Sequence, residues 1–213
     1  PTDVPVFVEL FDKPGPGRSR TTPLTTSNFL AYVADDAYDG TFIHRSVADF
    51  VVQGGGFQAP EVPANEIGSD PQVVPQRPTV ANEPGNSNVR GTIAMAKLGG
   101  NPDSATNQWY FNLSDNTFLD TDNGGYTVFG RVLGSGMAAI DVMGSALTFD
   151  ASTYYANQAF SDLPLWNVSQ DNIVRRDDFV RIEAVDVLQT GPMSLSATTN
   201  NALVSAAIVN GQL

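Results

Sequence analysis

The chain has 213 residues and a formal net charge of −12, with 23 acidic against 11 basic residues, which excludes the basic face that nucleic-acid binding requires. It contains no cysteine and one histidine, His44, so disulfides, thiol nucleophiles and most metal sites are excluded too. No apolar run approaches the roughly 18 residues that a membrane-spanning helix needs.

The first part of the chain predicts short strands and one helix. Residues 4–11 carry β-branched and aromatic side chains and run into a turn-rich segment, which is typical of a strand. A helix is expected after Pro23, because apolar residues then recur at helical spacing and the hydroxyl groups at 25–27 can cap it. Two short strands are expected next, at 41–47 and 50–53.

The second part begins with a proline-rich stretch, 59–84, which we expect to be a long surface excursion. Residues 145–178 show no regular pattern, and after Thr190 the chain becomes small and polar. Many short strands, two isolated helices and no strand–helix alternation favour a mainly β barrel or sandwich in one domain. The other expected elements are strands at 92–97, 109–113, 126–133 and 179–188, the last with a phase slip near Val185, and a helix at 137–143.

Three blocks of sequence, in this order, carry a family resemblance. The first is FIHRSVADFVVQGGGF at 42–57. The second combines RGTIAMAK at 90–97 with SATNQWYFNL at 104–113, and the third combines FLD at 118–120 with YTVFGRV at 126–132. Together they resemble the cyclophilin-type peptidyl-prolyl cis/trans isomerases, with bacterial-like features, over roughly residues 24–145.

The resemblance implies a mainly β fold, a closed eight-stranded antiparallel barrel capped by two helices, in a domain spanning 1–190. Within it, 59–84 and 145–178 are atypical loop regions, and 191–213 form a C-terminal tail of uncertain order. The implied activity is rotation of X–Pro bonds, without cofactor or metal, to assist protein folding. Expected partners are proline-containing peptides and unfolded protein clients. We expect a monomer in the periplasm or secreted, with the cytoplasm as the alternative.

The resemblance also assigns the site residues by motif position. Arg45, Phe50 and Gln53 take the catalytic positions. The remaining substrate-binding positions are Val51, Tyr110, Leu119 and Phe118 for the proline pocket and its rim, and Ala96, Lys97, Gln108 and Tyr126 for the groove beside Gln53.

This set of residues suits the chemistry. Rotation about a peptide bond faces a barrier of roughly 18–20 kcal/mol, and no bond is made or broken. The enzyme must therefore bind the twisted amide better than either planar isomer. Twisting returns a lone pair to the proline nitrogen, and a permanently charged guanidinium such as that of Arg45 can donate a hydrogen bond to it.

Two departures from the family pattern bear on the pocket. Tyr110 stands where the family usually has Phe, so a hydroxyl lies at the pocket floor and costs binding unless it finds a partner. Val51 replaces the common Met and leaves a smaller, stiffer wall. Tyr110 is the feature that favours a rival function, a cyclophilin-fold binding module or chaperone that holds proline segments with little catalysis.

Plainer interpretations compete for several of these residues. Phe50, Tyr110 and Leu119 could be ordinary core, and Gln53 and Gln108 could satisfy each other's amides. We interpret His44 as a structural, hydrogen-bonding residue. The glycines at 54–56 are better explained by close backbone packing than by phosphate binding, because no Lys-Ser/Thr follows them.

Overall fold

The computed structural model describes residues 4–61, 70–166, 174–188 and 205–209. The α-helices are α1 (Pro23–Ala34) and α2 (Gly136–Gly144), and short 3-10 helices are η1 (Thr117–Asp120), η2 (Asp122–Gly124), η3 (Gln158–Phe160) and η4 (Arg176–Asp178). The strands are β1 (Val6–Leu10), β2 (Thr41–Phe42), β3 (Arg45–Val47), β4 (Val51–Gly54), β5 (Phe57–Gln58), β6 (Gln72–Val73), β7 (Thr92–Met95), β8 (Trp109–Asn112), β9 (Val128–Val132), β10 (Leu147–Phe149), β11 (Leu163–Leu165), β12 (Arg181–Ile182), β13 (Ala184–Leu188) and β14 (Ser205–Val209).

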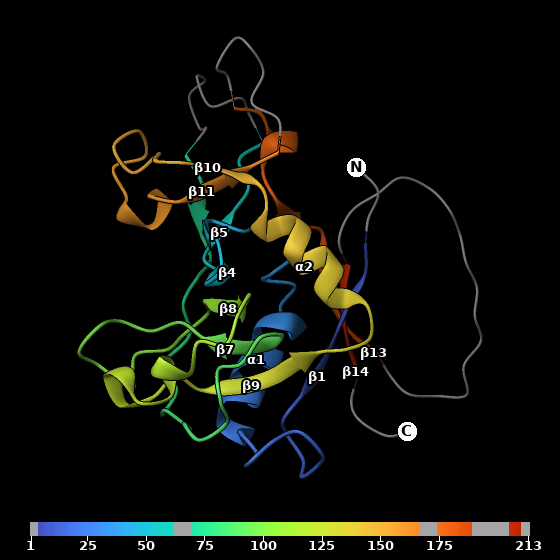
Figure 1. Cartoon of the computed structure of the whole chain (residues 1–213). Helices are drawn as coiled ribbons and strands as arrows, with labels where there is room; N and C mark the ends of the chain where they lie inside the picture. Colours follow the sequence, from blue (N-terminus) through green and yellow to red (C-terminus); the bar gives the residue numbers. More distant parts are fainter. Residues whose placement is uncertain (1–3, 62–69, 167–173, 189–204, 210–213) are drawn as a thin grey trace.

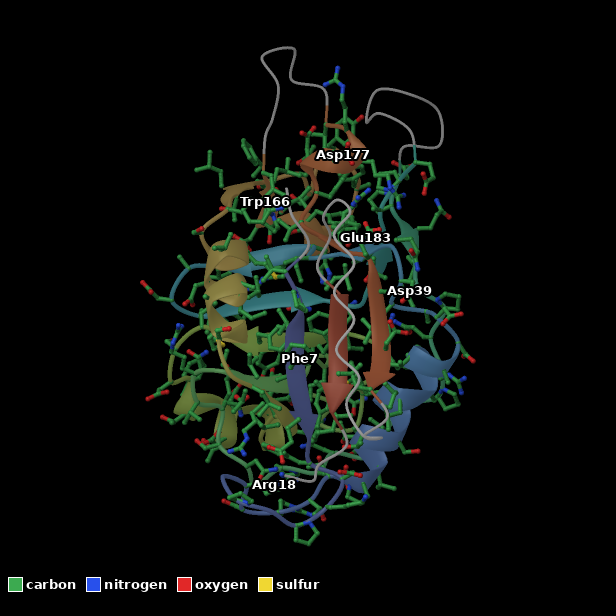
Figure 2. All side chains as sticks on the ribbon, turned by 90° about the vertical axis from the view of Figure 1, so that its right-hand side faces the viewer. Phe7, Arg18, Asp39, Trp166, Asp177 and Glu183 are labelled. Atoms are coloured by element: carbon green, nitrogen blue, oxygen red, sulfur yellow. The ribbon has the colours of Figure 1, made fainter. Side chains whose placement is uncertain are left out.

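Most strands belong to one sheet of eight, in the order β13-β14-β1-β9-β7-β8-β4-β3. A second sheet has the order β12-β2-β5-β6, and β10 pairs with β11 in a separate hairpin beyond α2 (Figure 1). The strand β14 lies between β1 and β13 and runs parallel to both, whereas the other described pairs are antiparallel (Figure 2). The mainly β architecture with two α-helices is therefore confirmed.

The expected closed barrel of eight antiparallel strands is wrong: the described residues form fourteen strands, and no sheet closes on itself. Both edge strands of the large sheet, β3 and β13, are preceded in the chain by strands of the second sheet, where β2 pairs with β12. Between β2 and β3 the backbone hydrogen bonds pass from the second sheet to the large sheet. The N–H of Ile43 donates to the carbonyl of Val180, and the N–H of the next residue, His44, donates to the carbonyl of Gln53. The expected phase slip near Val185 falls earlier, at Glu183, which separates β12 from β13 (Figure 2).

The main core follows from the two-residue period of the strands, because alternate side chains point to the same face of a sheet. One face of the large sheet packs against aromatic residues of α1 and apolar residues of α2. This core includes Val52, Ile93, Met95, Trp109, Phe111 and Phe129 from strands, and Phe29, Tyr32, Ile140 and Met143 from helices.

The N-terminus of α1 is capped by a residue from a distant part of the chain. The N-cap residue, Thr22, makes no side-chain hydrogen bond, and Thr25 and Thr26 lie buried inside the helix rather than before it. Instead, the backbone N–H groups of Leu24 and Thr25 donate to the carboxylate of Glu83 at 3.3 and 2.8 Å. A negative charge at this end also favours the helix dipole.

Residues 145–178 are more regular than the sequence suggests. They contain β10, η3, β11 and η4, and their aromatic and aliphatic side chains pack against the second sheet as a separate core. This core consists of Phe42, Phe57, Ala59, Phe160, Leu163, Leu165 and Phe179. The sequence does not reveal these elements, because their apolar residues lie in strands and turns that are too short to show a helical or strand periodicity.

The glycines at 54–56 confirm the close-packing interpretation. A Cβ on Gly55 would lie 2.7 Å from both the Asn107 carbonyl oxygen and the indole nitrogen of Trp109, and the backbone there has φ +79°. The tail region expected at 191–213 contributes β14, and its other residues lie outside the described part. None of the helices within the described ranges is long and apolar enough to cross a bilayer.

We expect Gly55→Ala to lower the free energy of unfolding by about 2–4 kcal/mol, because it combines a strained left-handed backbone with overpacking against Asn107 and Trp109. Denaturant unfolding measures this change. Gly99→Ala is the matched control, because no atom lies within 4 Å of a Cβ there and φ is not positive. Equal stability of the two variants would contradict the prediction.

Candidate active site

A row of five side chains crosses one face of the large sheet. In the strand register, Arg45 on β3 pairs with Gln53 on β4, and Gln53 pairs with Tyr110 on β8. Tyr110 pairs with Ala94 on β7, and Ala94 with Val128 on β9. Directly opposed residues of antiparallel strands have Cβ atoms about 4.5–5.5 Å apart, so the five lie side by side.

This face is opposite to the one that covers the main core. Val51, Ala94, Tyr110 and Val128 belong to a third, separate apolar cluster, while their sequence neighbours pack into the main core. The predicted pocket residues therefore lie outside the main core, in a cluster where Val51, Tyr110 and Leu119 are themselves buried, at 2%, 4% and 5% exposure. The cluster comprises Phe11, Val51, Ala94, Tyr110, Leu119 and Val128, with Phe50, Ala96 and Tyr126 half-buried at its edge.

Aromatic rings border this apolar patch. Phe50, in the turn before β4, stacks on Phe118 of η1 with ring centroids 5.8 Å apart, and the Phe118 side chain is 59% exposed. On the other side, Tyr126 lies edge-on to Tyr110 at 6.1 Å. Leu119 is buried against the patch, and its carbonyl accepts from the Tyr126 N–H at 2.9 Å. Predicted pocket and rim residues from four separate chain segments thus meet at one place.

The hydroxyl of Tyr110 points away from the patch into a buried polar network. It donates to Oδ1 of Asn88 at 2.8 Å, and Asn88 is fully buried. Burial raises the pKa of Tyr110 well above its ordinary value, so the hydroxyl stays protonated and remains a donor. The cost expected for an unpaired hydroxyl at the pocket floor therefore does not arise.

Arg45 lies at one end of the row with its side chain 32% exposed. Its Nε lies 3.4 Å from Oδ2 of Asp162, a residue of the segment 145–178 that also accepts the Ser46 N–H at its backbone carbonyl. Beside Arg45, Gln53 donates through Nε2 to Oε1 of Gln108 at 2.8 Å. The two amides do satisfy each other, but both side chains are half-buried at the groove rather than inside the core.

The ion pair with Asp162 is expected to make a small contribution to the function of Arg45. A pair this exposed contributes at most about 1 kcal/mol, so Asp162→Asn should lower any Arg45-dependent kcat/KM by no more than about fivefold. Peptide isomerisation kinetics at low and high salt measure it, and the difference between variant and wild type should shrink with salt. A loss above tenfold would show that Asp162 does more than orient the guanidinium.

Lys97 and Ala96 follow β7 at the far side of the patch. The Lys97 ammonium donates to the carbonyl groups of Asn123 and Gly125 at 2.8 and 2.7 Å and lies 4.6 Å from the centre of the Tyr126 ring. Partial burial lowers the pKa of Lys97, and the nearby Asp103 opposes this shift. Lys97 thereby connects the end of β7 to the loop after η1. The small side chain of Ala96 adds little volume to the wall of the groove.

His44 lies behind the site and is 1% exposed, with its ring edge-on to Phe57 at 5.0 Å. Burial lowers the pKa of His44 to about 3, the charge of Arg45 acts in the same direction, and the Gln108 side chain opposes them. The imidazole is therefore neutral at ordinary pH. Its burial agrees with a structural role, but neither ring nitrogen finds the hydrogen-bond partner expected from the sequence.

Sequence reasoning missed the polar residues behind the patch. Asn88 and Asp120 hold the Tyr110 hydroxyl, and Asp162 comes from a segment without a pattern. No local signal marks them, since each acts through a partner that is remote in the chain. Among the described residues no cluster of three His, Asp or Glu side chains could hold a metal ion.

Comparisons with known proteins show which protein family this chain resembles. The family described as "Cyclophilin type peptidyl-prolyl cis-trans isomerase/CLD" matches residues 18–163. A peptidyl-prolyl cis-trans isomerase of Acinetobacter baylyi is 36% identical over 149 residues, 69% of this chain and 72% of the relative. Peptidyl-prolyl cis-trans isomerase A of Dickeya dadantii is 39% identical over 136 residues, 62% of this chain and 65% of the relative.

Among solved structures, a cyclophilin-type isomerase of Cryptosporidium parvum, determined in the presence of the dipeptide Ala-Pro, aligns with a TM-score of 0.47 at 19% identity, covering 82% of this chain and 90% of that one. The family match alone spans more than half of the residues. This chain belongs to the cyclophilin-type peptidyl-prolyl cis-trans isomerase family. Its matched relatives in Acinetobacter and Dickeya are bacterial proteins named for that activity.

Proposed function

We propose that this chain accelerates rotation about X–Pro peptide bonds in protein substrates by non-covalent stabilisation of the twisted amide. The observation that carries the proposal is the row from Arg45 through Gln53 and Tyr110 to Val128, which places a half-exposed guanidinium beside an apolar patch outside the main core.

In this proposal the proline ring binds on Val51, Tyr110 and Leu119, with the stacked rings of Phe50 and Phe118 at its border. The apolar surface holds the ring and keeps water from the amide. The acyl side rotates while the guanidinium of Arg45 donates to the proline nitrogen. That hydrogen bond exists only in the twisted state, so it lowers the barrier rather than merely strengthening binding.

Polar groups along the row would hold the substrate backbone. The Gln53–Gln108 pair places amide donor and acceptor groups at the groove, next to Arg45. Ala96 and Tyr126 form the opposite wall, with Lys97 behind Tyr126. No group in this arrangement acts as a nucleophile or base, which matches a reaction that breaks no covalent bond.

Relaxation of a short peptide with one X–Pro bond from cis to trans tests the proposal. Uncatalysed relaxation takes tens to hundreds of seconds, so catalysis is readily resolved. Acceleration that is proportional to enzyme concentration would support it. A folded protein that binds the peptide without accelerating relaxation would support the binding-module function instead.

The clients and the setting are part of the same proposal. We propose that the substrates are unfolded proteins with exposed prolines, that the protein is a monomer and that it acts in the periplasm or outside the cell. Refolding kinetics of a proline-limited protein, sedimentation of the purified chain and fractionation of the producing cells test these three statements separately.

A further inference from the structure

Asn88 is a fully buried asparagine directly behind the proposed proline pocket. Its side-chain oxygen accepts from the Tyr110 hydroxyl at 2.8 Å and from the Asn112 amide at 3.4 Å. Its side-chain nitrogen donates to Oδ1 of Asp120 at 2.9 Å and to the Tyr126 carbonyl at 3.3 Å. All four hydrogen-bonding positions of the amide are therefore occupied.

Three of the four partners of Asn88 belong to different walls of the pocket. Tyr110 forms the floor, Tyr126 forms one side, and Asp120 ends the short helix η1 that carries Phe118 and Leu119. The Asn88 backbone joins the same wall, because its N–H donates to Asp120 at 2.7 Å and its carbonyl accepts from the N-cap residue of η1 at 2.8 Å. A single residue thus connects the floor to both sides.

Asp120 fixes which way the Asn88 amide faces. Partial burial alone would raise the pKa of Asp120, but hydrogen bonds from the Ser87 hydroxyl and from Asn88 outweigh it and lower the pKa. An ionised carboxylate can only accept, so it takes the NH2 group of Asn88. The Asn88 oxygen is then directed at Tyr110, whose hydroxyl must donate to it.

We propose that Asn88, oriented by Asp120, is a positioning residue for the proline pocket: it binds the Tyr110 hydroxyl away from the patch and so keeps the pocket floor apolar. The inference rests on the proposed function and adds the residue that lets a tyrosine serve as the floor. Without Asn88 the hydroxyl lacks its acceptor and draws water or turns towards the pocket, and proline binding weakens.

A double-mutant cycle tests this, using wild type, Asn88→Ala, Tyr110→Phe and the double variant. The readouts are the Kd for a short peptide with one Ala-Pro bond, followed by NMR titration, and KM and kcat from relaxation kinetics. Asn88→Ala should raise Kd about tenfold when Tyr110 is present and less than threefold in the Tyr110→Phe background. The rise in KM should exceed the fall in kcat.

A purely structural role of Asn88 would give the same loss in both backgrounds, because its other partners are unchanged. An equal loss, or none in either background, overturns the proposal. Asn86→Ala is the matched control: Asn86 is also buried and makes four hydrogen bonds, but to backbone groups of Ser19, Arg20 and Val128. It should lower stability without the dependence on Tyr110.

If Asn88→Ala fails to fold, Asp120→Ala replaces it in the cycle, because Asp120 is half-buried and its carboxylate orients the Asn88 amide. We then expect about a threefold rise in Kd that Tyr110→Phe abolishes, and an equal rise in both backgrounds overturns the proposal. Because Kd needs no catalysis, a wild type that binds without accelerating relaxation refutes the proposed function and leaves this test intact.

Discussion

Replacing Arg45 by alanine is expected to lower kcat/KM for a short X–Pro peptide by a factor of one hundred or more. The guanidinium lies at one end of the row, and its proposed hydrogen bond to the proline nitrogen exists only when the amide is twisted. Removing one such preorganised donor in other enzymes costs about a hundredfold to a thousandfold, or about 2.7–4 kcal/mol. Stopped-flow relaxation of the cis peptide measures the change.

Two further variants separate the role of charge from that of shape. Arg45→Lys keeps the charge but loses the planar fork of donors, so we expect a loss of at least tenfold. Arg77→Ala removes an arginine that pairs with Asp35 on the surface, away from the row, and should leave the rate unchanged. If Arg45→Ala isomerises the peptide as fast as wild type, the proposed mechanism is wrong even if the chain is an isomerase.

Acid is expected to destabilise the protein between pH 6.5 and about 3 through His44. Burial lowers the pKa of His44 from its ordinary 6.5 to about 3, so the folded protein keeps the imidazole neutral while the unfolded chain takes up a proton. The unfolded state then binds more protons, and a falling pH favours it. The stability that the neutral His44 contributes is fully present above pH 6.5 and is lost as the pH falls towards 3. Over this range the free energy of unfolding falls with a slope approaching about 1.4 kcal/mol per pH unit.

Urea unfolding at pH values from 7.5 to about 5.5 measures this slope before ordinary carboxylates, with pKa values of about 4, begin to titrate. His44 is the only histidine in the chain, so the assignment is direct. In His44→Gln the free energy of unfolding should be nearly constant over the same range. An unchanged slope in that variant would place the titrating group elsewhere.

The elements with a clear local pattern were predictable. The strands around the site and both α-helices appear where β-branched runs and helical spacing indicated them, within a few residues at the ends. The alternation of Trp109, Tyr110 and Phe111 also contains the information that one of them faces away from its neighbours. The pattern of a single strand does not determine which of its two faces packs into the main core. Here the family resemblance indicated which face carries the candidate site.

Features that depend on remote partners were not predictable. The cap of α1 comes from Glu83, 58 residues from the Thr25 N–H that it binds, so hydroxyls within the helix looked like the natural caps. The barrel was wrong because closure depends on where two segments bend, at His44 and Glu183, and neither residue breaks strands by itself. Asn88 escaped notice because its role exists only through Tyr110 and Asp120.

The row that crosses the sheet has a consequence for the way the site forms. Its members come from five strands, between positions 45 and 128, and each depends on its partner's register. A slip of one residue in any of these strands would turn that side chain to the opposite face. A chain emerging during synthesis therefore has no complete site until β9 has joined, and the recovery of isomerase activity during refolding would report when these strands reach their native alignment.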